Sequence, residues 1–471
     1  MSHFSYPELL TASQGDAFTP PVAFGEARLW TDTRSIQPGD FFLPLSGERF
    51  DGHHYLEQAF EAGAVGAFVE RHQAAQNPQW QKLPNLIAVD SPVLAYLAMA
   101  RYHREKINPV VIAVTGSSGK TTTKEMLYAA LSPLKQTVKT EKNFNNEVGV
   151  SQTLLALRPG TEILIVEMGM RGLRQICLLS EAARPDVAII NNIGPAHIGL
   201  LGSLEAIAQA KLEVVEGMNP AQGLLVINQD TPHLSGLAPT LWSGKTVSYS
   251  LNEAQNLQPA LEAGVEGSRF TYGGVTVTLP VPGEHMVSNA LGVLKVGEAL
   301  GFSAAALASG LSQFKPEKGR GERVMLQGYR DVCVIDDAYN ANPDSAKASL
   351  KAFLSTVKPG KQNFLVIGGM KELGDFSQQY HQQLGFWLAA QPHINGLFTL
   401  GEEGQWLADA ASSATFPVRH AQDIPHLVRQ LTEGSFTLEN AVLYLKGSRA
   451  YQLDQIPAAL ERVALNLEVP S

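Results

Sequence analysis

The stretch that decides the fold is Val110-Val111-Ile112-Ala113-Val114-Thr115-Gly116-Ser117-Ser118-Gly119-Lys120-Thr121-Thr122. Its first part is a β-branched apolar run, which is typical of a buried strand. The two glycines, Gly116 and Gly119, then allow a tight turn in which successive backbone N–H groups face one anion. A helix that begins near Thr121 would add its positive end at the same point. The pattern predicts a phosphate-binding loop between a buried strand and a helix.

The side chains of this loop indicate which phosphate compound it binds. Lys120 is placed to reach the β- and γ-phosphates of a nucleotide, and the Thr121 hydroxyl suits Mg²⁺. The loop is a short form, because Val114 stands where the common phosphate loop has its first glycine. The sequence has no Asn-Lys-x-Asp segment, which usually accompanies guanine selectivity. ATP is therefore favoured over GTP, and the alternative is an ordinary Gly/Ser turn between a strand and a helix.

Strand-like and helix-like patterns alternate on both sides of this loop. Such alternation predicts a parallel sheet that is covered by helices on both faces. The expected strands of this middle part are 110–115, 163–167, 187–191 and 224–228. A Gly273-Gly274 pair inside the apolar alternation of 270–279 predicts an appended antiparallel hairpin. A second strand series follows, at 332–336, 364–367, 397–400 and 442–445, and each of its strands ends in Gly or polar residues.

Length and pattern together predict three α/β domains. A chain of 471 residues is too long for one compact core. We expect a small α/β domain over 1–85 and a central domain over 86–314, which carries the phosphate loop and a small antiparallel sheet. A C-terminal Rossmann-like α/β domain is expected over 315–471. Ligands of open α/β sheets bind beyond the carboxyl ends of the strands, so both larger sheets have a candidate functional edge.

Composition narrows the class of protein further. With 44% hydrophobic and 17% charged residues, the chain is in the range of ordinary globular proteins. The net charge of −9 argues against a nucleic-acid partner. Two cysteines, Cys177 and Cys333, exclude a disulfide framework and suit a reducing compartment. No export signal and no membrane-spanning run is present in the sequence, so a cytoplasmic location without membrane insertion is expected.

Two residues at strand ends are candidate metal ligands. Glu167 ends the strand next to the phosphate loop, where a carboxylate can meet the Mg²⁺ of a nucleotide. The alternative for Glu167 is a solvated residue at a strand end. His197 follows the strand at 187–191, again at a carboxyl end. A single histidine in a loop is more often structural or exposed than a ligand.

Lys211 lies on the apolar side of its predicted helix. Ala208, Lys211, Leu212 and Val215 have the spacing i, i+3, i+4 and i+7, which marks an inward stripe. An unpaired ammonium there costs several kcal/mol, so it must be neutralised, paired or modified. Reaction with CO₂ would give a carbamate, an anion suited to a second Mg²⁺. The alternative is that the side chain extends to the surface.

The assembled motifs resemble the Mur ligase family of peptidoglycan synthesis. The loop from Thr115 to Thr122 is similar to the short phosphate loop of that family, and the resemblance covers essentially the whole chain in order. It implies that Thr121, Glu167, His197 and a carbamylated Lys211 hold two Mg²⁺ ions around ATP, with Lys120, Lys211, His197 and Glu167 as the catalytic group. It also implies further nucleotide contacts from Asn289, Arg323, Asp336, Tyr339 and Asn340.

Other segments resemble one branch of the family, which joins D-alanyl-D-alanine to UDP-N-acetylmuramoyl-tripeptide. These segments are 142–150, 336–345, 369–374 and 446–449. The resemblance implies the following substrate-side residues: Thr33, Arg34, Ser35, Gly47, Asp51 and His53 for the UDP-sugar, and Asn143, Asn145, Asn146, Lys446 and Ser448 nearer the reaction.

The implied activity is ATP-dependent ligation through an acyl phosphate, by a monomer whose hinge lies near 314–321. Three alternatives stay open: a related Mur ligase that adds a single amino acid, a folylpolyglutamate synthetase, and a nucleotide-gated binding protein without chemistry. The folate alternative is weakened because the first block has no role in that family. The presence of Glu167, His197 and Lys211 speaks against a protein that only binds nucleotide.

Overall fold

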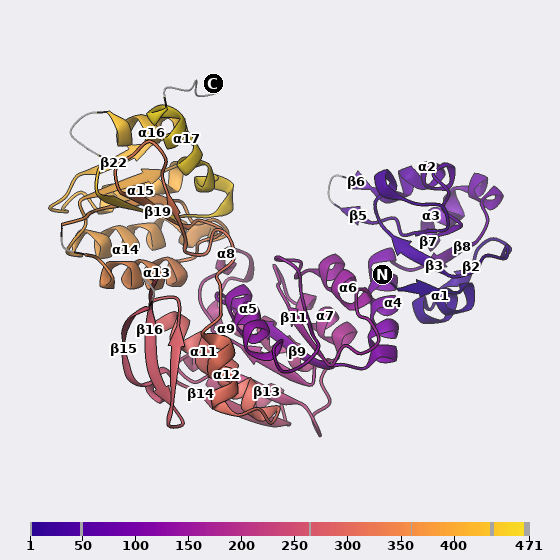
Figure 1. The fold of residues 1–471 in the computed structure, drawn as a ribbon. Coiled ribbons are helices and arrows are strands. Elements are labelled where there is room, and N and C mark those ends of the chain that lie inside the picture. The colour runs from indigo at the N-terminus through magenta and orange to yellow at the C-terminus, as the bar shows by residue number, and fades with distance from the viewer. Residues whose placement is uncertain (1, 48–49, 263–264, 359, 434–437, 466–471) are drawn as a thin grey trace.

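The computed structural model describes residues 2–47, 50–262, 265–358, 360–433 and 438–465. Three α/β units follow one another along the chain, each with its own sheet, and they are called the first, middle and C-terminal units below (Figure 1). The predicted α/β class and its three-part arrangement are confirmed. Within the described residues, no helix has the length and apolar character that a membrane crossing needs.

The first unit is a six-stranded sheet with the order β1-β3-β4-β7-β8-β2. Its strands are β1 (His3–Phe4), β2 (Asp16–Ala17), β3 (Ala27–Trp30), β4 (Phe41–Phe42), β7 (Gly66–Glu70) and β8 (Leu86–Val89). A short hairpin, β5 (Ser46–Gly47) with β6 (Phe50–Asp51), stands beside it. The helices are α1 (Tyr6–Ser13), α2 (Leu56–Glu61) and α3 (Arg71–Gln76).

The strand β8 corrects the predicted boundary of this unit. The first domain was expected to end at residue 85, but β8 begins at Leu86 and pairs in parallel with β7. Its four residues are all buried, so they belong to the core of the first sheet. Residues 78–82, shortly before β8, form a 3₁₀ turn that lies within the unit. The first sheet therefore extends to Val89.

The middle unit is a six-stranded, fully parallel sheet with the order β10-β11-β9-β12-β13-β14. Its strands are β9 (Val110–Thr115), β10 (Thr137–Lys139), β11 (Ile163–Glu167), β12 (Val187–Ile190), β13 (Leu224–Asn228) and β14 (Lys245–Tyr249). The four strands that the sequence predicted are β9, β11, β12 and β13. These are the four central strands of the sheet. They could be predicted because central strands are buried on both faces and therefore have continuous apolar sequences.

Helices cover both faces of the middle sheet. They are α4 (Pro92–Ile107), α5 (Lys120–Leu131), α6 (Glu147–Leu155), α7 (Gln175–Ala183), α8 (Ile198–Leu201), α9 (Leu204–Leu212), α10 (Pro232–Leu241), α11 (Glu284–Ala299) and α12 (Ala304–Leu311). Val111 and Ala113 of β9 pack with α4, α6, α7 and α9, whereas Ile112 and Val114 pack with α5, α11 and α12. The alternating residues of one strand thus divide between two hydrophobic cores.

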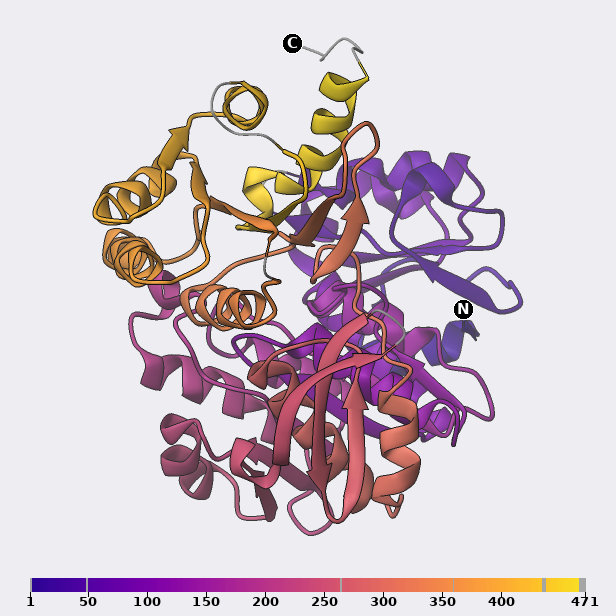
Figure 2. The same ribbon diagram turned by 60° about the vertical axis from the view of Figure 1, so that its left-hand side comes forward.

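The predicted hairpin is part of a three-stranded antiparallel sheet, β15 (Gln255–Glu262), β16 (Val265–Tyr272) and β17 (Val275–Leu279). Gly273 and Gly274 both have positive φ between β16 and β17, as the glycine pair predicted. Figure 2 shows this sheet as a separate layer against the middle unit. Phe270, Val277 and Leu279 bury its inner face in the core that contains α11 and α12.

The C-terminal unit is a six-stranded sheet with the order β18-β19-β23-β20-β21-β22, parallel except for β18. Its strands are β18 (Glu322–Met325), β19 (Val332–Asp337), β20 (Gln362–Gly368), β21 (Gly396–Leu400), β22 (Val418–Ala421) and β23 (Ala441–Lys446). Its helices are α13 (Pro343–Ser355), α14 (Ser377–Ala389), α15 (Glu402–Ala410), α16 (Ile424–Thr432) and α17 (Ile456–Ala464). The second predicted strand series corresponds to β19, β20, β21 and β23.

Candidate active site

The candidate site lies where three neighbouring strands of the middle sheet end. The phosphate loop follows β9, which pairs with β11 on one side and β12 on the other. Glu167 is the last residue of β11, and His197 follows β12 by a loop of six residues, 191–196. Parallel strands bring their carboxyl ends to one edge, so residues far apart in the sequence meet there.

Two glycines give the phosphate loop its shape. Gly116 has φ of +148° and Gly119 has φ of +75°, both unfavourable for residues with a side chain. A Cβ atom on Gly119 would lie 2.9 Å from Asn289 Oδ1, so the loop and the side chain of Asn289 on α11 are in close contact. This contact places Asn289, which was predicted to bind the nucleotide, directly against the loop.

The loop is held in place by hydrogen bonds to the segment that follows β12. The backbone N–H of Ser118 donates to Asn192 Oδ1 at 2.9 Å. Ser117 Oγ donates to the carbonyl oxygen of Gly194 at 3.0 Å and accepts from the Gly194 N–H at 2.9 Å. Thr115 Oγ1 donates to the carbonyl oxygen of Met168, which follows β11. The loop is thus fastened to both neighbouring strand ends.

Lys120 begins α5 and turns back over the loop. Its ammonium donates to the carbonyl oxygen of Gly116 at 2.8 Å. Burial lowers the pKa of Lys120, and the negative charge of Glu167 partly offsets this. A partly dehydrated cation attracts an anion such as a phosphate more strongly than a cation in water does.

Glu167 has one oxygen in a hydrogen bond and one that is free of hydrogen bonds but within ion-pair distance of Lys124. Its Oε1 accepts from Asn145 Nδ2 at 2.8 Å. Its Oε2 is buried and has no hydrogen-bond partner among the described residues, while Lys124 Nζ lies 3.8 Å away. A buried carboxylate oxygen without a donor is costly unless a cation meets it. The free oxygen therefore suits a divalent cation.

His197 stands in a strained backbone conformation and touches the C-terminal unit. Its φ is +64°, which is uncommon for a residue with a side chain. Its Nδ1 lies 2.6 Å from Glu372 Oε2, and Glu372 Oε1 accepts from Arg171 Nη2 at 2.7 Å. These contacts with His197, followed by the one with Arg171, lower the pKa of Glu372 to about 2 despite its burial. Glu372 thus ties the C-terminal unit to two residues of the middle unit.

Lys211 is buried on α9, as its position in the apolar stripe predicted. Its exposed fraction is 2%, so the alternative of a side chain that extends to the surface is wrong. Burial lowers the pKa of Lys211 well below its ordinary value, and the charge of Lys120 lowers it further. No hydrogen bond or ion pair joins its ammonium to another described residue. The lowered pKa of Lys211 thus shifts this amine toward its neutral form.

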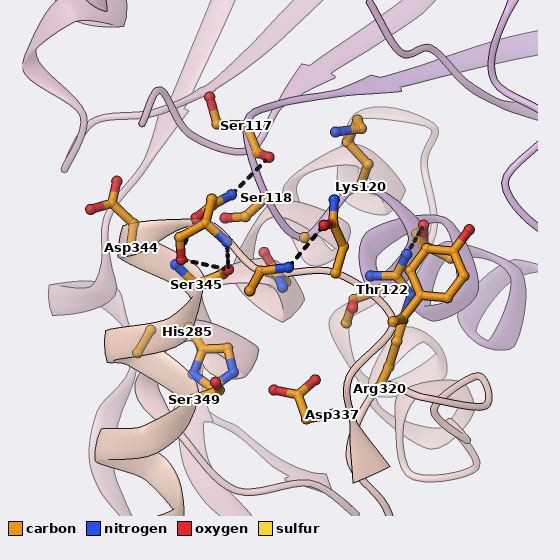
Figure 3. Close-up of a pocket in the computed structure, with 18 of the residues that line it drawn as sticks. Ser117, Ser118, Lys120, Thr122, His285, Arg320, Asp337, Asp344, Ser345 and Ser349 are labelled. Carbon is orange, nitrogen blue, oxygen red and sulfur yellow. Dashed lines mark hydrogen bonds between the residues drawn. The ribbon is translucent and has the colours of Figure 1, made fainter. Parts of the chain in front are cut away.

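A cavity of about 920 Å³ opens beside the phosphate loop, between the middle and C-terminal units. Figure 3 shows Ser118, Lys120 and Thr122 of the middle unit at the same cavity as Asp337 and Ser345 of the C-terminal unit. The lining contains these sequence-predicted residues: Ser117, Ser118, Gly119, Lys120, Thr121, Thr122, Asn143, Asn145, Asn146, Glu167, His197, Asn289, Arg323, Tyr339, Asn340 and Lys446. A single space thus joins the phosphate loop, the candidate metal ligands and the polar loop at 143–146.

The connection between α12 and β18 brings Arg320 to the phosphate loop. Arg320 Nη2 donates to Thr121 Oγ1 at 2.9 Å, and its guanidinium carbon lies 4.5 Å from the centre of the Tyr339 ring. The Arg320 Nε atom is buried without a hydrogen-bond acceptor among the described residues. A buried donor that lacks an acceptor suits an anion, as the free oxygen of Glu167 suits a cation.

The comparisons with known proteins agree on one family. The family model "Mur ligase family, catalytic domain" matches residues 28–106, "Mur ligase middle domain" matches 114–297, and "Mur ligase, glutamate ligase domain" matches 319–449. A protein of Synechocystis sp. named UDP-N-acetylmuramoyl-tripeptide–D-alanyl-D-alanine ligase is 39% identical over 404 residues, 85% of this chain and 85% of that protein. The chain belongs to the Mur ligase family.

Solved structures of Mur ligases have the same fold. MurF from Acinetobacter baumannii matches with a TM-score of 0.86 and 30% identity, over 98% of this chain and 99% of that one. MurF ligase from Thermotoga maritima, in complex with ADP, matches with a TM-score of 0.80 and 27% identity, over 93% and 98%. The resemblance to the Mur ligase family, which the motifs predicted, is confirmed over nearly the whole length of this chain.

The structure places some predicted residues of this Mur ligase elsewhere than expected. Among the described residues, the cavity lining does not include Thr115, Gly116, Lys211, Asp336, Ser448 or the residues of the first unit. Asp336 is buried and accepts from the Ala338 N–H at 3.0 Å, whereas the next residue, Asp337, lines the cavity. Burial raises the pKa of Asp336. Asp336 is therefore a structural residue of the β19 turn.

Two further predicted substrate residues have structural roles. His53 is fully buried, its Nδ1 lies 2.7 Å from Asp51 Oδ1, and its Nε2 accepts from the Glu70 N–H at 3.1 Å. With both ring nitrogens used inside the fold, the His53 side chain is not a direct substrate contact. Ser448 Oγ accepts from the Lys371 N–H at 2.9 Å and thereby fixes the turn after β20. Thr33, Arg34, Ser35 and Gly47 lie in the first unit, with Arg34 paired to Asp32 and exposed.

Four residues at this site were missed as site residues from the sequence. Glu372 lies inside the predicted segment 369–374, and Arg320 lies three residues before the predicted Arg323. The sequence therefore indicated both segments but not the contacts that these two side chains make. Asp337 is the neighbour of a predicted residue. The fourth is Lys124, which has the spacing i, i+3 and i+7 with Leu127 and Leu131 and is fully buried. The pattern that identified Lys211 would have identified Lys124 as well.

Proposed function

We propose that this chain joins D-alanyl-D-alanine to UDP-N-acetylmuramoyl-tripeptide, with hydrolysis of ATP to ADP and phosphate. The product is UDP-N-acetylmuramoyl-pentapeptide, a precursor of peptidoglycan. The observation that carries the proposal is the cavity itself, in which a phosphate loop faces a polar loop and a second α/β unit. The names of the relatives, which match over most of the chain, support the choice of substrates.

The three units have separate proposed roles. The first unit, through β8, holds the UDP-sugar with Thr33, Arg34, Ser35, Gly47 and Asp51. The middle unit, to about residue 314, holds the ATP phosphates, and the C-terminal unit, 315–471, closes the nucleotide side and receives the dipeptide. The connection at 314–321 is the proposed hinge, because it is the one covalent link between the two units that line the cavity.

The nucleotide contacts are proposed as follows. The backbone N–H groups of 119–122 at the start of α5 and the Lys120 ammonium hold the β- and γ-phosphates, because the N–H groups of Ser117 and Ser118 already donate to Asn192. Arg320, whose buried Nε lacks an acceptor, binds a phosphate oxygen when ATP is present. Asn289 lies against the loop, and Arg323, Tyr339 and Asn340 line the cavity toward the C-terminal unit.

The residues at the loop fit bound Mg²⁺. Mg²⁺ in phosphate sites uses one or two protein carboxylates, several waters and the substrate phosphates. Glu167 offers a buried free oxygen, with Thr121 and His197 beside the same cavity. Among the described residues no three His, Cys, Asp or Glu side chains form a metal cluster. When bound, Mg²⁺ would neutralise charge on the transferring phosphate.

A carbamate on Lys211 is the second part of the proposed metal site. A neutral amine reacts with CO₂ and loses a proton, and burial together with the charge of Lys120 lowers the pKa of Lys211, which favours that neutral amine. The reaction would turn an unpaired buried amine into an anion beside Lys120. Glu167 and a carbamate on Lys211 would then supply the anionic groups that hold two Mg²⁺ ions.

The proposed reaction has two steps. A carboxylate oxygen of the tripeptide attacks the γ-phosphorus of ATP in line, and the bond from that phosphorus to the ADP oxygen breaks. This gives an acyl phosphate and ADP. The amine nitrogen of D-alanyl-D-alanine then attacks the acyl carbon, the tetrahedral intermediate loses a proton from nitrogen, and phosphate leaves with the C–O electron pair.

The residues of the chain act mainly by position and charge. Asn143, Asn145 and Asn146 orient the carboxylate, with Asn145 fixed by its hydrogen bond to Glu167. Good orientation alone lowers a barrier by up to about 7–11 kcal/mol. Lys120 stabilises charge on the phosphate that moves. The residues of α13 and of the turn after β19, which line the cavity from the C-terminal unit, keep water from the acyl phosphate.

The substrate assignment is tested by phosphate release with the muramoyl tripeptide and a choice of amines. We expect release with D-alanyl-D-alanine and only background release with free amino acids or with folate substrates. Strong turnover with a free amino acid such as meso-diaminopimelate, and none with the dipeptide, would replace the proposal by a related Mur ligase activity. ATP binding without phosphate release, even with both substrates, would mean that the chain only binds nucleotide.

A further inference from the structure

A buried lysine lies beside the phosphate loop and is not used in the reaction described above. Lys124 is on α5, one helical turn after Lys120, and its side chain has an exposed fraction of 0%. Buried lysines are rare unless they are paired, because removing an ammonium from water is costly. What surrounds Lys124 therefore indicates why the chain keeps a charge there.

Three different parts of the site meet at the Lys124 ammonium. Its Nζ donates to the carbonyl oxygen of Lys142 at 2.6 Å and to Glu317 Oε1 at 3.4 Å. The free oxygen of Glu167 lies 3.8 Å away, and Glu125 Oε1, on the same helix, lies 3.2 Å away. Lys142 belongs to the polar loop before α6, and Glu317 belongs to the connection between α12 and β18.

The contact with Lys142 fixes the loop that carries the substrate asparagines. Lys142 has φ of +49°, a left-handed conformation that a lysine rarely adopts without support. Its carbonyl is held by Lys124 on one side of the loop. Three residues later, Asn145 is held on the other side, by its hydrogen bond to Glu167 and by the Gly169 N–H that donates to its carbonyl oxygen.

The contact with Glu317 ties the hinge to the same helix. Glu317 and Arg320 are three residues apart on the hinge, and they contact Lys124 and Thr121, which are three residues apart on α5. Residues with this spacing lie on one face of a helix. The hinge therefore runs beside the first turn of α5 and is attached to it at two points.

We propose that Lys124 is a positioning residue, whose ammonium fixes both the substrate loop at Lys142 and the hinge at Glu317 to the helix of the phosphate loop. The inference rests on the proposed function, since the loop at 143–146 is taken to orient the tripeptide carboxylate. Lys124 does not touch the nucleotide loop itself, which has its own hydrogen bonds to 192–194. Its loss should therefore disturb the tripeptide more than the nucleotide.

The test compares Lys124→Met, which keeps the length of the side chain without the charge, with the wild type. We expect kcat/KM for the muramoyl tripeptide to fall about 10–100-fold, as when a reacting group is misplaced by a distant change. The KM for the tripeptide should rise, while the dissociation constant of ADP, measured by calorimetry, stays within about threefold. Ligation by the wild type in the same assay is the reference. If the wild type does not ligate the two substrates, the proposed function is contradicted, whereas the role of Lys124 is judged only from the difference between the variants.

The matched control is Lys139→Met. Lys139 pairs with the other oxygen of Glu125 and belongs to the same group of charges, but it contacts neither Lys142 nor Glu317. We expect this variant to keep the tripeptide KM even if it melts at a lower temperature. An equal rise of the tripeptide KM in both variants, or an equal loss of tripeptide and ADP binding in Lys124→Met, would overturn the positioning role.

A second variant keeps the test decisive if Lys124→Met does not fold. Glu317 has a side-chain exposed fraction of 32%, so Glu317→Gln removes the negative charge from the hinge contact with little effect on the core. We expect this variant to raise the tripeptide KM less than Lys124→Met does. Where Lys124→Met folds, adding Glu317→Gln to it should raise the KM no further, because the effects of changing two residues in contact are not additive. A Glu317→Gln variant with an unchanged tripeptide KM would contradict the link to the hinge.

Discussion

Replacing Lys120 with methionine lowers the ligation rate by about 10²–10³-fold, the loss typical of removing one group that stabilises charge in a transition state. Methionine keeps the length of the side chain, so the packing of α5 against the sheet is retained. What is lost is the ammonium that bends back to the Gly116 carbonyl and stands over the loop. The rate is measured as phosphate release with saturating ATP, tripeptide and dipeptide.

The control for this variant is Lys135→Met, which removes an exposed lysine shortly after α5. Lys135 pairs with Glu162 at the surface, where an ion pair contributes about 0–1 kcal/mol, and it is not part of the cavity. Its rate should equal that of the wild type. A Lys120→Met enzyme that turns over within about threefold of the wild type would contradict the role of Lys120 in charge stabilisation.

Replacing Lys211 should lower the ligation rate but should not lower the melting temperature. We expect Lys211→Ala to lose at least about 10²-fold in rate, because an anion of the metal site is gone. Added short-chain carboxylates such as formate or acetate should restore part of the rate, since they can occupy the space that alanine leaves. Lys211→Met should be equally inactive, yet melt at the same or a higher temperature, because an unpaired buried amine is removed.

The carbamate itself is measured without turnover. After incubation with ¹³C-labelled bicarbonate, the wild type should show a carbamate carbon by NMR that Lys211→Met lacks. Two results would rule out this role for Lys211: full activity of Lys211→Ala, or an equal carbamate signal in the methionine variant. Either would leave Glu167 as the anionic residue of the proposed Mg²⁺ site.

The sequence predicted best the elements whose pattern is local. The strands β9, β11 and β13 begin and end at the predicted residues, because each is a continuous apolar run bounded by Gly or polar residues. The edge strand β14 was missed because most of its residues are solvent-facing and polar, so no such run exists. The strand β15 was missed because Pro259 and its glutamines resemble a loop. β8 was assigned to the wrong unit because a polar turn precedes it.

The candidate site was predictable to the extent that single motifs define it. The phosphate loop and Glu167 are read from adjacent residues, the polar loop at 143–146 follows from the family resemblance, and all three contribute to the lining of one cavity. The contacts of Arg320 with Thr121 and of Glu372 with His197 join residues far apart in the chain. Such contacts depend on how the C-terminal unit sits on the middle unit, which no local pattern specifies.

His53 and Asp336 show the opposite error. Both lie in motifs that were correctly recognised, yet their side chains serve the fold, His53 by orienting Asp51 and Asp336 by capping the turn after β19. A motif indicates that a segment matters but not which of its side chains face the ligand. Burial decides this, and burial follows from packing between elements that are distant in the sequence.

The central claim, that the tripeptide carboxylate is activated as an acyl phosphate, is tested most directly by an oxygen label. The tripeptide is prepared with ¹⁸O in both oxygens of its terminal carboxylate and ligated to D-alanyl-D-alanine with unlabelled ATP. The account predicts that the released phosphate carries one ¹⁸O atom for each pentapeptide formed, as seen by mass spectrometry. Pentapeptide formation with unlabelled phosphate would contradict it.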